Sequence, residues 1–152
     1  MKLPAYLLIC GMGLLAAACL DSGNIPGVTA DPDASAKAAF PEVPAAGDAM
    51  KLKERGSKLF QGLGCQSCHS TKDDRSGLMG PPLGGVSDRV LERNDHDPLK
   101  GRRWLVMHVK DPLMYPSPFA DQPEYRGTHM PPNPRVTDED LRALVEFLWT
   151  LR

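Results

Sequence analysis

The chain has 152 residues, with 18 basic and 19 acidic side chains and a formal net charge of −1 at pH 7. This balance gives no basic excess of the kind that binds nucleic acid, so we expect no nucleic-acid partner. Of the four cysteines, Cys10 and Cys19 belong to the N-terminal segment, and Cys65 and Cys68 share one short motif. No pair therefore remains for a disulfide.

Residues 1–18 have the layout of a secretory signal. Lys2 supplies a positive start, and an apolar run rich in Leu and Ala follows it. An uncleaved membrane anchor is the alternative, but such an anchor needs about 20 apolar residues. This run is shorter and stops at Asp21. The pattern therefore predicts export.

The end of the signal resembles the lipobox of bacterial lipoproteins. Two small residues, Ala17 and Ala18, precede Cys19, although Ala16 stands where a lipobox prefers Leu. Cys10 is a weaker candidate, because the residue before it is bulky. The resemblance implies that Cys19 becomes the acylated first residue and anchors the chain to a bacterial membrane, on the periplasmic side. Simple cleavage with an unmodified Cys19 is the alternative.

Residues 19–47 are interpreted as the lipidated cysteine followed by a flexible tether. From Leu20 to Gly47 the sequence is mostly Ala, Pro, Gly, Asp and Ser, with few large apolar residues. Such a composition predicts a segment that buries too little to order itself. Treated as a random coil, about 28 residues reach about 30 Å. A poorly ordered terminus without a role is the alternative.

Residues 48–152 are predicted to form one all-α domain. No strand-like alternation occurs in them, whereas helical periodicity follows residues 49–60. A shorter helix is predicted over Arg103–Lys110, ending before a proline, and a last helix begins after Thr137 as its N-cap. Three helices with long loops make a thin core, which predicts that something large and apolar fills the middle.

The sequence Cys65-Gln66-Ser67-Cys68-His69 is the C-x-x-C-H motif of c-type haem attachment. Two thiols three positions apart can each add to one vinyl group of a haem, and the imidazole that follows is then held beneath the iron. A zinc site would need further ligands at short spacing, and no Cys follows Cys68. A thioredoxin-like motif needs no His and belongs in a βαβ setting. One covalent haem c is the expected cofactor.

Beyond this motif, the domain resembles the class I (monohaem) cytochromes c. Gly56 and Phe60 match the small and aromatic pair of the family's first helix, and Leu144, Phe147 and Leu148 match its last helix. The resemblance implies a small all-α fold of three or more helices and long loops around one haem. It also implies that the first and last helices cross at the glycine.

Gly80-Pro81-Pro82-Leu83 matches the family's Gly-Pro-x-Leu loop. There the proline carbonyl accepts the second N–H of the proximal histidine, so the resemblance gives this role to Pro81 and makes His69 the proximal ligand. Arg89 stands where an arginine often meets a haem propionate.

Met130, in the segment 127–132, matches the family's distal ligand loop, in which a Met precedes a Pro just before the last helix. The resemblance makes Met130 the distal ligand. Its neighbour His129 could replace it, although an exposed His129 is an equal alternative. His96 and His108 are interpreted as surface or helix-face residues. The other methionines of the domain are interpreted mainly as core filling: Met50, Met79, Met107 and Met114.

With His69 and Met130 on the iron, no open position remains for a substrate, so the sequence predicts an electron carrier rather than an enzyme. The expected partners are redox proteins of a respiratory chain, and no small-molecule substrate is expected. Two alternatives stay open. One is a fixed haem subunit of a larger membrane oxidoreductase, and the other is a haem enzyme or gas sensor with an open distal site.

Overall fold

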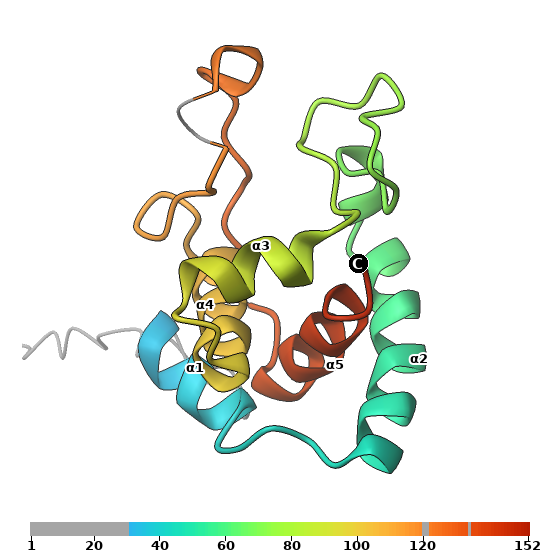
Figure 1. Ribbon diagram of the computed structural model, residues 1–152, viewed down its shortest axis with the longest axis vertical. Helices are drawn as coiled ribbons and strands as arrows, with labels where there is room; N and C mark the ends of the chain where they lie inside the picture. Colours follow the sequence, from blue (N-terminus) through green and yellow to red (C-terminus); the bar gives the residue numbers. More distant parts are fainter. Residues whose placement is uncertain (1–30, 120–121, 134) are drawn as a thin grey trace, which may run out of the picture.

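The computed structural model describes residues 31–119, 122–133 and 135–152, and this part of the chain contains helices and no strand. Its α-helices are α1 (Pro32–Ala39), α2 (Ala46–Gly62), α3 (Val86–Arg93), α4 (Pro98–Lys110) and α5 (Asp138–Leu148). Figure 1 shows the helices gathered together, with two long loops extending beyond them, one after α2 and one after α4. The all-α fold expected from the sequence is confirmed.

Helices α2 and α5 pack against each other at Gly56. A Cβ on Gly56 would overlap the carbonyl of Ala143 and lie 2.7 Å from Cβ of Phe147, so only glycine permits this approach. Beside the crossing, the ring centroids of Phe60 and Phe147 lie 5.4 Å apart. The predicted crossing of the first and last helices of the domain is therefore confirmed.

The C-terminal helix begins as predicted. Oγ1 of Thr137 accepts a hydrogen bond of 3.1 Å from the backbone N–H of Asp140, which satisfies one free donor of the first turn. The acidic first turn of α5 also meets α2, because Arg55 donates to Glu139 and, at 2.6 Å, to Asp140. The cap and this pairing fix where α5 starts against α2.

Helix α4 is longer than predicted. It begins at Pro98, five residues before Arg103, because the carboxylate of Asp97 accepts hydrogen bonds from the backbone N–H groups of Leu99, at 2.8 Å, and Lys100, at 3.1 Å. Proline at the first helical position supports this start. The helix ends at Lys110, before Asp111-Pro112, as predicted.

The structure contradicts the predicted tether over residues 31–40, which contain α1 and a buried Phe40, whereas residues 41–45 are non-helical and mostly exposed. Asp31 caps α1 by accepting a hydrogen bond of 2.9 Å from the N–H of Asp33. Ala39 and Phe40 follow Ala36 by three and four residues, which places them on one side of the helix, and all three are buried where α1 packs against α4 and α5. The composition argument considered this segment alone, whereas one aromatic and small neighbours suffice where other helices supply the opposite surface. Residues 19–30 lie outside the described ranges.

Helix α3 was not predicted, and it adds Val86 and Val90 to the core. The folded domain therefore extends back at least to residue 31, and its described part contains two α-helices more than the sequence periodicity indicated. Within the described ranges, no helix is both long enough and apolar enough to cross a membrane.

Candidate functional site

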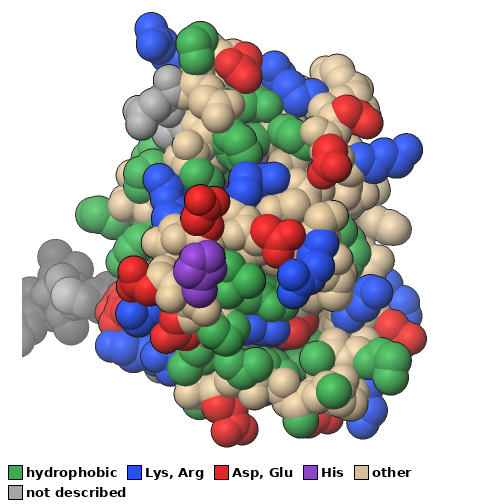
Figure 2. Space-filling model, in the orientation of Figure 1, with side chains coloured by type: hydrophobic (Ala, Val, Ile, Leu, Met, Phe, Trp, Pro, Cys, Tyr) green, Lys and Arg blue, Asp and Glu red, His purple; other side chains and the backbone are tan. Residues whose placement is uncertain are grey.

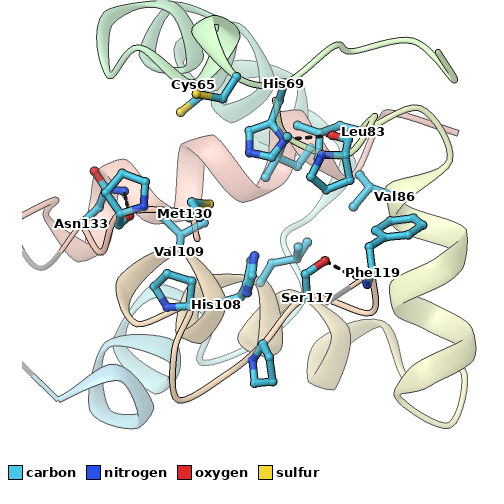
Figure 3. A pocket seen from close by; sticks show the side chains of 18 of the residues that line it. Cys65, His69, Leu83, Val86, His108, Val109, Ser117, Phe119, Met130 and Asn133 are labelled. Atoms are coloured by element: carbon cyan, nitrogen blue, oxygen red, sulfur yellow. Dashed lines mark hydrogen bonds between the residues drawn. The ribbon is translucent and has the colours of Figure 1, made fainter. Parts of the chain in front are cut away.

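A cavity of about 360 Å³ lies among the helices and the two long loops. Its volume is within the range of small-molecule and cofactor sites, and apolar side chains form most of its wall. The structure brings to this one cavity every residue predicted to hold a haem within the domain: Cys65, Cys68, His69, Pro81, Arg89 and Met130. Figure 3 shows several of these side chains from close by.

The two cysteines sit on a tight turn after α2. Gly64 has a φ of 77°, which reverses the chain at the end of the helix, and a single 3₁₀ turn over Cys65–Ser67 follows. The N–H groups of Cys68, at 3.2 Å, and His69, at 3.0 Å, both donate to the carbonyl of Cys65. Both thiols are free and half-buried, and burial raises the pKa of Cys65. The turn therefore presents two thiols and one imidazole to the same cavity.

The ring of His69 is held by the loop that follows it. Its Nδ1 lies 2.9 Å from the carbonyl oxygen of Pro81. Because a carbonyl only accepts, the neutral ring carries its proton on Nδ1 and keeps a lone pair on Nε2. A Cβ on Gly80 would lie 2.6 Å from Cε1 of His69, so the loop contacts the ring closely. The structure therefore brings the ring of His69 and the carbonyl of Pro81 to hydrogen-bonding distance.

Arg89 forms part of the cavity wall, and hydrogen bonds to two backbone carbonyls hold its guanidinium in one orientation. It donates hydrogen bonds to the carbonyls of Gly84, at 2.6 Å, and Pro82, at 2.9 Å. Its Cζ lies over the ring of Phe119, 5.0 Å from the ring centroid. Among the described residues, its buried Nε has no hydrogen-bond partner. Burial lowers the pKa of Arg89. A cation held in this way could pair with a carboxylate of a bound group.

Met130 is half-buried, packs against the core and contributes to the cavity wall. His129 beside it is exposed. Of the other methionines of the domain, only Met79 also borders the cavity, and its side chain is 62% exposed. Met130 is therefore the methionine that combines burial with a place in the cavity.

His108 lies on a face of α4, one of the two places that the sequence interpretation allowed, but that face borders the cavity, which the sequence did not indicate. Its side chain forms part of the cavity wall, and its Nδ1 is 2.6 Å from the carbonyl oxygen of Tyr115. Its ring stacks on that of Trp104, with the ring centroids 5.1 Å apart and the ring planes 7° apart. Burial lowers its pKa. Its spacing from Trp104 and Leu105, four and three residues, was the available signal that it shares their face of α4.

In the described ranges, no group of three or more His, Cys, Asp or Glu side chains is arranged to hold a metal ion. A family model described as Cytochrome c matches residues 53–152, about two thirds of the chain. No curated protein and no solved structure gives a significant match.

Proposed function

Because the chain belongs to the cytochrome c family, in which covalent haem serves electron transfer, we propose that it is a monohaem electron carrier. Cys65 and Cys68 form the thioethers to the haem, His69 is the proximal ligand and Met130 the distal ligand. Arg89 faces a propionate. When bound, the haem supplies a centre that takes up and releases one electron.

One observation carries this proposal: the Cys-x-x-Cys-His turn, the His69–Pro81 hydrogen bond and Met130 meet at a single apolar cavity. The carbonyl of Pro81 fixes the tautomer of His69 and leaves Nε2 available to iron. The cavity also accounts for the thin core, since the helices surround a space that a flat apolar ring would fill.

A carrier is favoured over an enzyme because His69 and Met130 would both be available to bind the haem iron, which would leave no open position for a substrate. A thioether ligand and an apolar surrounding favour the reduced iron, which predicts a reduction potential toward the upper end for haem proteins. The segment 127–132 is rich in proline, which restricts its backbone and holds Met130 in place.

We place the protein outside the cytoplasm, where cytochrome c domains typically lie, and anchored to the membrane through Cys19. The signal pattern and the lipobox resemblance of residues 1–19 support this location. Its partners are then redox proteins of a respiratory chain on the same side of the membrane.

A fixed subunit of a larger oxidoreductase is the second candidate. Three apolar side chains that border the cavity are exposed: Leu63 by 40%, Met79 by 62% and Leu113 by 67%. Such a rim could be covered permanently by a partner or be used in brief encounters. Recovery of a second protein in constant proportion, after mild detergent extraction, would favour the subunit.

The central test is haem attachment. The protein is produced with a cytochrome c maturation system and extracted with acidified organic solvent, and the haem should remain on the peptide that contains Cys65 and Cys68. The oxidised protein should show the long-wavelength band of a sulfur–iron bond and titrate as a one-electron centre. Cys68→Ala should leave at most one thioether. Haem that extracts freely from the unmutated protein would refute the proposal.

A further inference from the structure

Two histidines at the cavity share one hydrogen-bond arrangement. Nδ1 of His69 lies 2.9 Å from the carbonyl of Pro81, and Nδ1 of His108 lies 2.6 Å from the carbonyl of Tyr115. In the neutral form of each ring the proton is therefore on Nδ1, and Nε2 keeps its lone pair. Histidines that bind metals nearly always donate their other N–H in this way. His108 thus has the same preparation as the proposed proximal ligand.

The ring of His108 is also fixed in place. Helix α4 holds its backbone, Trp104 stacks on its face, and burial favours its neutral form. Figure 3 shows His108, Met130 and His69 entering the same pocket from three different segments. His129, although next to Met130, is exposed. His129 also borders this cavity, but besides His69 only His108 has, among the described residues, a ring nitrogen held by a hydrogen bond there.

We propose that His108 is a reserve sixth ligand of the haem iron, which replaces Met130 when the sulfur is displaced. The inference rests on the proposed function. The exchange breaks an iron–sulfur bond and forms an iron–nitrogen bond with Nε2. It moves no proton and no electron, because Nε2 already carries a lone pair. An imidazole in place of the thioether lowers the reduction potential and keeps small external ligands off the iron.

The test uses the haem-loaded protein with Met130→Leu, alone and combined with His108→Gln. The single variant should give the ferric low-spin spectrum of an iron with two imidazole ligands. The double variant should be high-spin. External imidazole should bind the double variant at least about tenfold more tightly, because in the single variant it competes with a tethered ligand.

Two matched double variants control for the other histidines. Met130→Leu with His129→Gln removes the neighbour of Met130, and Met130→Leu with His96→Gln removes a histidine outside the cavity wall. Both should stay low-spin, as the single variant does. Met130→Ala serves as a second form of the single variant if the leucine form does not mature.

A single variant that is already high-spin would overturn the proposal, and so would a low-spin state that disappears with His129→Gln. Failure of the proposed function has a different result, namely an unmutated protein without covalent haem. An unmutated protein that lacks the sulfur band, and loses its low-spin state with His108→Gln alone, would overturn both the Met130 assignment and the reserve role.

Discussion

At Gly56 the space that a side chain would need is already occupied by α5. The hypothetical Cβ meets the carbonyl of Ala143 and Cβ of Phe147, and a backbone carbonyl cannot rotate away as a long side chain can. The same helix supplies a comparison at Gly62, where a Cβ would have no neighbour within 4 Å. Within one helix, the packing therefore excludes a side chain at Gly56 and leaves room for one at Gly62.

Gly56→Ala should lower the free energy of unfolding of the haem-loaded protein by about 1–3 kcal/mol, the usual cost of overpacking a close contact. Gly62→Ala should change it by about 1 kcal/mol or less, toward greater stability, because alanine has the higher helix propensity. Chemical denaturation of both variants measures the difference. Equal effects would show that α2 and α5 do not depend on a close approach at residue 56.

The residues of the candidate site were predictable where a short motif contains them. The spacing of Cys65, Cys68 and His69 is local, and the Pro81 and Met130 assignments came from short loop patterns. His108 was missed because its setting depends on packing. Its hydrogen-bond partner, Tyr115, lies in the loop after α4, and only the folded chain shows that this face of α4 borders a cavity.

Among the helices, α1 is the least expected, because its segment has no strong apolar periodicity and yet packs against the core of the domain. Phe40 is fully buried just after α1, and Nε of Arg103 in α4 donates to its carbonyl at 2.8 Å. The buried ring of Phe40 and the hydrogen bond from Arg103 to its backbone carbonyl therefore both attach this residue to the domain. Helices α2, α4 and α5 were predictable from their own periodicity and boundaries, whereas α1 and α3 are short and acquire their buried faces from neighbours.

Phe40→Ala should lower the free energy of unfolding by about 3–5 kcal/mol, since it removes a fully buried ring. Val43→Ala is the matched control three residues later, because Val43 is exposed, and it should cost less than about 1 kcal/mol. Both values come from denaturation of the haem-loaded protein without its signal. A small effect of Phe40→Ala would indicate that α1 is not part of the cooperative domain.

For the molecule as a whole, basic and acidic side chains nearly balance, with 18 of the first and 19 of the second. Figure 2 shows basic and acidic side chains interspersed over the face in view, with hydrophobic side chains between them. This agrees with the formal net charge of −1. The face in view therefore offers no large field of one sign to attract a strongly charged partner, and we expect membrane attachment to depend on the N-terminus instead.

Cys19→Ser should move the mature protein from the membrane fraction to the soluble exported fraction and leave its visible spectrum unchanged, because the cysteine lies outside the haem domain. Cys10→Ser should leave the protein in the membrane fraction. Fractionation after expression in a bacterium with lipoprotein processing measures both. If the unmutated protein is already soluble after export, the lipidation proposal is wrong.

The docking of α1 changes how far the haem domain can travel from such an anchor. A free segment as far as residue 47 would span at most about 100 Å between Cys19 and the domain, at about 3.5 Å per residue. With the folded body reaching back at least to residue 31, at most residues 20–30 remain as a connection, and their greatest span is about 40 Å. The volume that the domain can search shrinks with the cube of this length, by more than tenfold. An anchored carrier would then meet partners in its own membrane at a correspondingly higher effective concentration and would not reach across a wide compartment.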